Sequence, residues 1–177
     1  QEYYNYLNTN SGYILIICAF GIANDTIDYK DELYYWDSDK NHSNWQKANT
    51  KMFSLVFDYQ KKLMKEYISG IKSLVKQFPN ENFIIRPHPV EKVSTYKKFF
   101  EGNFNVRVIS NGSIQEWLPG SKVFIHNGCT TAIEALCHGI EPISFVPHYK
   151  DEFIQYVTHD ISEKVYNEKD LRQIFEK

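Results

Sequence analysis

The chain has 177 residues, of which 42% are hydrophobic, and its formal net charge is −2. This length and composition predict one folded domain with a substantial core, and they exclude a chain that is disordered throughout. The absence of a long basic run argues against nucleic acid as the main partner, because binding to a phosphate backbone needs clustered Lys and Arg.

The first predicted strand, Tyr13–Phe20, is apolar at every position. Continuous hydrophobicity is typical of a strand covered on both faces, as in a parallel sheet. Residues 21–50 are polar and show no regular period, which predicts a long loop holding at most a short helix. From Lys51 to Phe78 apolar residues recur at three- and four-residue steps opposite lysines, and Pro79-Asn80 follows. This pattern predicts a long amphipathic helix.

Strands and helices are then predicted to alternate to the end of the chain. Further strands are expected at Phe83–Arg86, Phe104–Ile109, Lys122–His126 and Pro142–Val146. Helices are expected at Glu91–Phe100, Ser113–Leu118, Thr130–His138, Asp151–Tyr156 and Glu168–Glu176. Ser113 and Glu116 have the spacing of a capping box. The alternation predicts an α/β fold, a Rossmann-like parallel sheet flanked by helices on both faces.

The three cysteines, Cys18, Cys129 and Cys137, are scattered and form no CxxC pair, so we expect reduced thiols. The polar start of the chain lacks the features of a signal peptide, and no apolar run approaches the length of a membrane span. These features predict a cytoplasmic protein. Because the chain does not begin with Met, we expect a part of a longer protein, with residues 1–12 a remnant or linker and 13–177 the domain.

The segment Arg86-Pro87-His88-Pro89 directly follows a predicted strand and is the first candidate site. The two prolines restrict the backbone around His88 and hold its imidazole in a stiff loop. Ligands of an open α/β sheet bind at the carboxyl ends of its strands, so we expect His88 to hydrogen-bond a phosphate there, or to protonate it as it leaves. Arg86 would add a second cation. The alternative is a proline-stiffened turn with an incidental histidine.

The segment Asn127-Gly128-Cys129-Thr130-Thr131 follows another predicted strand and opens a helix. Asn127-Gly128 allows a tight turn, and free N–H groups at the helix start, with the threonine hydroxyls, would form an anion site. Ordinary capping by threonine is the alternative. Together with the first segment, this loop predicts one crevice that holds a nucleotide.

Other polar side chains near these loops suggest different chemistry. Glu134, one turn into the helix, would accept hydrogen bonds from ribose hydroxyls or, alternatively, stabilise the positive end of the helix dipole. His126 and Cys129 could form half of a zinc site, but no second pair is present, so no metal is expected. The sequence contains no nucleophile elbow, Walker loop or Gly-x-Gly-x-x-Gly fingerprint.

The combination of Phe83–Glu91 with His126–Ala135, Gly139 and Pro142 resembles the C-terminal half of GT-B glycosyltransferases. More narrowly, it is similar to bacterial surface-carbohydrate and capsule-biosynthesis proteins. Their relatives include Kdo transferases, sialyltransferases with a His-Pro motif and a Ser/Thr motif, and CDP-glycerol glycerophosphotransferases. The resemblance spans roughly Tyr13–Pro147.

This resemblance implies the donor-binding domain of a nucleotide-sugar-dependent glycosyltransferase of surface-polysaccharide biosynthesis, with a CMP-linked donor. It implies that His88 contacts the donor phosphate and acts in catalysis, that Thr130 and Thr131 hold the phosphate, and that Glu134 approaches the ribose. The other residues expected in the donor site are Arg86, Pro89, Asn127, Gly128 and Cys129.

In such enzymes the acceptor, a saccharide or lipid-linked saccharide, binds mainly to an N-terminal domain, which we expect this chain to lack. The chain alone is therefore expected to bind nucleotide but to be inactive. The donor is a substrate, and neither a cofactor nor a nucleic-acid partner is expected. The full-length protein would be cytoplasmic or peripheral to the inner face of the membrane. Two alternatives stay open: half of a UDP-sugar epimerase-like enzyme, and a non-catalytic nucleotide-binding module.

Overall fold

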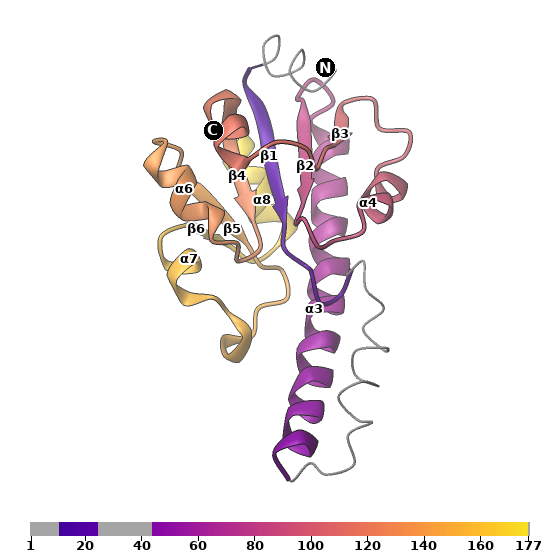
Figure 1. Ribbon diagram of the computed structural model, residues 1–177. Helices are drawn as coiled ribbons and strands as arrows, with labels where there is room; N and C mark the ends of the chain where they lie inside the picture. Colours follow the sequence, from indigo (N-terminus) through magenta and orange to yellow (C-terminus); the bar gives the residue numbers. More distant parts are fainter. Residues whose placement is uncertain (1–10, 25–43, 177) are drawn as a thin grey trace.

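The computed structural model describes residues 11–24 and 44–176. The predicted remnant up to residue 10, and residues 25–43 of the predicted loop, lie outside this part. The described residues form one six-stranded parallel sheet in the order β3-β2-β1-β4-β5-β6 (Figure 1). Its strands are β1 Tyr13–Cys18, β2 Phe83–Pro87, β3 Val106–Val108, β4 Ser121–His126, β5 Pro142–Phe145 and β6 Glu163–Val165.

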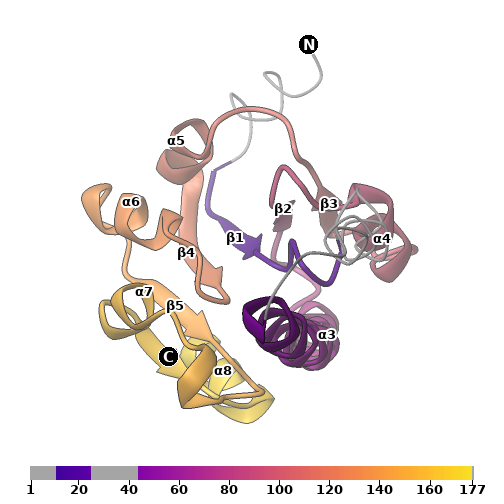
Figure 2. The ribbon, with the colours of Figure 1, turned by 60° about the horizontal axis from the view of Figure 1, so that its bottom comes forward.

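Helices cover both faces of the sheet, which confirms the predicted α/β fold class. Helices α3, α4 and α8 lie on one face, and α5 and α6 lie on the other (Figure 2). The helices are α3 Asn44–Gln77, α4 Val93–Phe99, α5 Ile114–Trp117, α6 Thr131–Cys137, α7 Tyr156–Asp160 and α8 Glu168–Phe175. Two short 3-10 turns are η1 Leu118–Gly120 and η2 Asp151–Phe153.

Strand β1 is the centre of the core, and all six of its side chains are buried. The even-numbered residues from Ile14 to Cys18 pack with the side chains of α3, α4 and α8. The odd-numbered residues from Tyr13 to Ile17 pack with Trp117 and the small residues of α6. Because successive side chains of a strand point to opposite faces, a run that is apolar at every position serves both layers.

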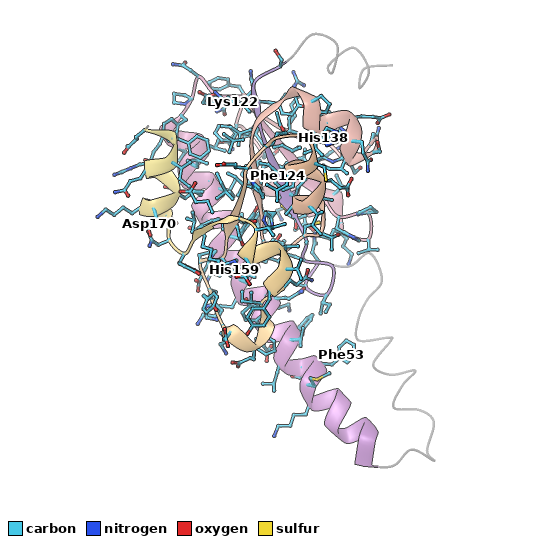
Figure 3. All side chains as sticks on the ribbon, turned by 90° about the vertical axis from the view of Figure 1, so that its left-hand side faces the viewer. Phe53, Lys122, Phe124, His138, His159 and Asp170 are labelled. Atoms are coloured by element: carbon cyan, nitrogen blue, oxygen red, sulfur yellow. The ribbon has the colours of Figure 1, made fainter. Side chains whose placement is uncertain are left out.

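Helix α3 has 34 residues and so is about 50 Å long. It begins at Asn44, before the predicted start at Lys51. Its N-terminal part extends past the carboxyl edge of the sheet, where Figure 3 labels Phe53. Where a helix extends beyond the sheet, it has no core to face and needs no regular repeat of apolar residues. This explains why the sequence pattern did not predict the start at Asn44. No helix in the described ranges has both the length and the apolar character of a membrane span.

Two details near the C-terminus differ from the sequence prediction. The predicted helix Asp151–Tyr156 is instead the turn η2 followed by α7, which begins at Tyr156. Strand β6, which pairs with β5, was not predicted. Only Val165 of its three residues is buried, so the segment has no hydrophobic pattern that would mark a strand.

Gly70 lies where α3 comes closest to the sheet. A Cβ atom at this position would lie 2.5 Å from Cζ of Phe145 in β5. That separation is far below van der Waals contact, so the packing of α3 on β5 requires a residue without a side chain.

We therefore predict that Gly70→Ala lowers the free energy of unfolding by about 1–3 kcal/mol through overpacking. The effect would outweigh the gain of about 1 kcal/mol that alanine gives in a helix interior. Urea denaturation of the variant measures it. Ser54→Ala, at an exposed position of α3, is the control and should be neutral or slightly stabilising. A Gly70→Ala protein at least as stable as the wild type would contradict the close packing.

Candidate functional site

The strand order reverses between β1 and β4. In open α/β sheets ligands bind outside the carboxyl ends of the strands at such a reversal. Strand β1 pairs with β2 on one side and with β4 on the other. The residues that follow these three strands are Ala19, His88 and Asn127, so the topology brings both sequence motifs to the same edge.

The backbone of His88 is fixed against the end of β1. Its N–H donates to the carbonyl of Cys18 at 3.0 Å and to Oε1 of Glu91 at 3.1 Å. Its Nδ1 accepts from the N–H of Val90 at 3.4 Å, which leaves Nε2 to carry the ring proton. The side chain is exposed, as is that of Pro89. The stiff loop thus presents the Nε2–H donor of His88 to solvent at the ligand edge.

Glu91 organises this loop, although sequence analysis did not single it out. It is only 2% exposed. Its carboxylate accepts hydrogen bonds from the N–H of Phe20 at 3.0 Å, from that of His88, and from the hydroxyl of Tyr96. Nδ2 of Asn24 lies 3.4 Å from its second oxygen. The carboxylate therefore joins the segment after β1 to the segment after β2.

Asn127 makes the corresponding link on the other side of β1. Its Oδ1 accepts from the N–H of Ala19 at 2.9 Å, and its Nδ2 donates to the carbonyl of Ala19 at 3.2 Å. This two-point contact uses both ends of the amide. Asn127 therefore holds the loops after β1 and β4 together, rather than offering its side chain to a ligand.

His126, the last residue of β4, shapes the turn that follows. Its Nδ1 accepts from the N–H groups of Gly128 at 3.0 Å and Cys129 at 3.3 Å. Its Nε2, which must then carry the proton, lies 2.9 Å from Oγ of Ser162. Burial lowers the pKa of His126 to about 3, so the ring is neutral near neutral pH. Of the N–H groups at the helix start that were expected to be free, that of Cys129 is therefore already taken by His126, as is the N–H of Gly128 before it.

The start of α6 keeps polar groups without internal partners. Thr130 has helical backbone angles, and its hydroxyl makes no capping hydrogen bond. In the described part of the chain, the N–H groups of Thr130 and Thr131 meet no backbone or side-chain acceptor, and Oγ1 of Thr131 is buried without a partner. Gly128, with φ of 108°, makes the turn into this helix. These donors are what the loop offers to an anion.

Glu134 lies on α6 and bonds to a neighbouring element. Nε2 of Gln115, from α5, donates to its Oε2. The carboxylate therefore faces α5, and a ribose approaching it would share it with Gln115. The predicted capping box of α5 is confirmed: the Ser113 side chain accepts from the N–H of Glu116, and Oε2 of Glu116 accepts from the N–H of Ser113 at 2.9 Å.

The side chain of Arg86 is hydrogen-bonded within the protein. Its two terminal nitrogens donate to the carbonyls of Asn111 at 2.7 Å and Gly112 at 2.8 Å. The guanidinium also lies over the ring of Trp117, 5.5 Å from its centroid. Arg86 thus fixes the loop between β3 and α5, and its prediction as a second phosphate-binding cation loses its support.

No group of three or more His, Cys, Asp or Glu side chains in residues 11–24 and 44–176 is arranged to hold a metal ion. His126 and Cys129 are joined by a hydrogen bond, in which Nδ1 of His126 accepts from the backbone N–H of Cys129.

Comparison with known proteins supports the fold. No family model matches the sequence, and a search of curated proteins finds no match. Two structures of UDP-GlcNAc 2-epimerase from Methanocaldococcus jannaschii, one in complex with UDP-GlcNAc and UDP, are similar, with TM-scores of 0.57 and 0.58 at 13% identity. The alignments cover 99% of this chain and 41% of the epimerase chain, so the chain spans about two fifths of those proteins. At this identity the likeness shows a shared GT-B-like Rossmann fold.

We predict that Glu91→Gln lowers the free energy of unfolding by about 2–3 kcal/mol, because it replaces charge-assisted hydrogen bonds and brings an NH2 group against N–H donors. Urea denaturation measures the change. Glu101→Gln, at an exposed position, is the control and should be nearly neutral. Equal stabilities of the two variants would show that Glu91 does not hold the strand ends.

Acid should destabilise the protein through His126. Its pKa is about 3 in the fold and about 6.5 when unfolded. Below pH 6.5 the unfolded chain therefore binds a proton that the folded chain does not. The free energy of unfolding should fall with pH, by up to about 1.4 kcal/mol per pH unit.

The measurement is chemical denaturation at several values between about pH 6.5 and 5. His159, whose pKa is also lowered by burial, acts in the same direction. The comparison that isolates His126 is therefore with His126→Gln, whose profile should be flatter. His138→Gln, at an exposed position, should keep the wild-type slope. Identical slopes for all three proteins would contradict a neutral buried His126.

Proposed function

We propose that this domain binds a nucleotide sugar at the carboxyl edge formed by β1, β2 and β4, as the donor-binding half of a nucleotide-sugar-dependent glycosyltransferase. One observation carries the proposal. The two sequence motifs are both locked by hydrogen bonds onto the end of β1, beside the reversal of strand order. This is the position at which Rossmann-like folds bind nucleotides.

The groups left free at this edge suit a diphosphate. His88 would donate a hydrogen bond from Nε2 to a phosphate oxygen. To protonate that oxygen as the phosphate leaves, the ring would first have to gain a proton on Nδ1, which would end the contact with the N–H of Val90. The N–H groups of Thr130 and Thr131 would donate from the opposite loop, with the hydroxyl of Thr131 as a further group. Each charge-assisted hydrogen bond of this kind contributes about 1.5–3 kcal/mol.

The remaining predicted site residues have supporting roles in this proposal. Asn127, Gly128 and Cys129 shape the loop, and Arg86 fixes the loop between β3 and α5. Glu134 stays the candidate for the ribose hydroxyls, and it would share its carboxylate between Gln115 and the sugar.

Two observations favour different reactions. The motifs resemble those of bacterial surface-polysaccharide transferases, which favours a CMP-linked donor and a saccharide or lipid-linked acceptor bound by another domain. The fold neighbours are UDP-GlcNAc 2-epimerases, one of them with UDP bound, which favours a UDP-linked substrate. Both alternatives place a nucleoside monophosphate or diphosphate at the same edge. The identity of the base therefore separates them.

The test is calorimetric titration of the chain with CMP, CDP, UMP, UDP and GMP. We expect a preference for one pyrimidine nucleotide. His88→Ala should weaken the preferred nucleotide at least about tenfold, or about 1.4 kcal/mol, because it removes a fixed donor. His138→Ala, on the opposite end of α6, is the matched control and should bind like the wild type.

Preference for a cytidine nucleotide would support the transferase, and preference for a uridine nucleotide would support the epimerase-like alternative. Unchanged binding by His88→Ala would remove His88 from the site. Absence of binding to every nucleotide at millimolar concentration would overturn the proposal.

A further inference from the structure

A groove of about 300 Å³, the α3–α4 groove, lies between helices α3 and α4 and the turn that follows β1 (Figure 1). The turn supplies Ala23 and Asn24, α3 supplies four residues from Lys61 to Ile68, and α4 supplies Thr95 and Phe99. The volume is at the lower end of the range of about 300–1,000 Å³ that is typical of ligand sites. None of these residues belongs to the proposed nucleotide edge, so the groove is a separate feature of the molecule.

Most of the surface of the α3–α4 groove is apolar. Met64 and Ile68 of α3 form its base, and both belong to the core between α3 and the sheet. Phe99 of α4 forms one side and keeps 38% of its surface exposed. A contiguous and concave apolar surface favours a ligand with an apolar part.

Two positive charges stand at this apolar surface. Lys61 and Lys65 are exposed and lie one turn apart on α3, where like charges repel each other. Among the described residues neither ammonium group makes an ion pair, and the nitrogen of Lys61 lies 4.3 Å from the centroid of the Phe57 ring. No acidic side chain is among the described residues that line the groove. An anion bound between the two lysines would relieve their repulsion.

Hydrogen bonds fix the third wall of the groove. Nδ2 of Asn24 donates to the carbonyl of Lys92 at 3.3 Å, and the N–H of Lys92 donates to the carbonyl of Asn24 at 2.9 Å. The turn after β1 is therefore fastened to the start of α4, and the groove keeps its shape without a ligand. The hydroxyl of Thr95 adds one hydrogen-bonding group on the α4 side. A site that exists before binding needs little ordering when the ligand arrives.

We infer that the α3–α4 groove binds an anionic amphiphile, whose aliphatic chain lies against Met64, Ile68 and Phe99 and whose carboxylate or phosphate meets Lys61 and Lys65. A nucleotide would leave the apolar walls uncovered, and a neutral lipid would leave the two charges unpaired. A free fatty acid and the acyl chain and phosphate of a membrane lipid share the required chemistry. The inference is independent of the proposed function, because the two sites share no residue.

The test is calorimetric titration of the chain with octanoate, decanoate and dodecanoate, each below its critical micelle concentration. Affinity should rise about threefold to fourfold for each added methylene group until the groove is filled. Decanol, which has the same chain length as decanoate and no charge, should bind at least about tenfold more weakly than decanoate.

Variants locate the binding. The double variant Lys61→Ala/Lys65→Ala should weaken decanoate at least about fivefold, with an unchanged Tm because both side chains are exposed. Lys62→Ala, an exposed lysine of the same turn that does not line the groove, is the matched control and should bind like the wild type. Thr95→Phe narrows the groove and should reduce the dependence of affinity on chain length.

Vesicles distinguish the two sources of the ligand. Sedimentation with phosphatidylcholine vesicles that contain phosphatidylglycerol, but not with phosphatidylcholine alone, supports a membrane lipid if the double lysine variant loses it. Binding of the fatty acids without sedimentation supports a free acid.

Three outcomes would overturn the inference. The first is absence of binding to all three acids and to the anionic vesicles. The second is equal affinity for decanoate and decanol, or unchanged binding by the double lysine variant. The third is self-association of the wild type that Thr95→Phe abolishes without changing the binding of decanoate, since the groove would then be an interface between two copies of the chain.

Discussion

The candidate site depends first on the buried carboxylate of Glu91. It accepts from the backbone after β1 at Phe20, from the backbone after β2 at His88, and from Tyr96 on α4. A buried carboxylate that lost these donors would be left unpaired, at a cost of several kcal/mol. The ends of β1 and β2 and the helix α4 therefore keep one arrangement, and His88 keeps one position relative to the centre of the sheet.

Two uncharged side chains do the same for the loop on the other side of β1. Asn127 binds both backbone groups of Ala19, and the neutral ring of His126 accepts from the two amides that follow. The polar residues of these loops thus fall into two groups, those that build the loops and those that face outward. Thr130, Thr131 and His88 belong to the second group, which is why their removal should change binding more than folding.

The sequence predicts the parts of this molecule that depend on local pattern. The unbroken apolar run of β1 predicted a strand buried on both faces, and the strand ends that carry His88 and Asn127 were placed within a residue or two. Partners distant in the chain were not predictable. Arg86 is bonded to carbonyls 25 and 26 residues away. In the sequence, Glu91 is an acid at the start of a predicted helix, and only the fold brings the N–H of Phe20 to its carboxylate. Strand β6 was missed because only one of its residues is buried.

Among the described residues, the candidate site contains fixed N–H and O–H donors. Arg86, the arginine of the two motifs, is bonded within the fold, and the chain as a whole carries a net charge of −2. If a phosphate binds here as proposed, its recognition would depend on the fit of these donors at short range. Donors that are held in place before the ligand arrives need no reorganisation when it binds. Hydrogen bonds weaken steeply with distance and angle, so the proposed binding would depend on the rigidity that Glu91, Asn127 and His126 give to three strand ends.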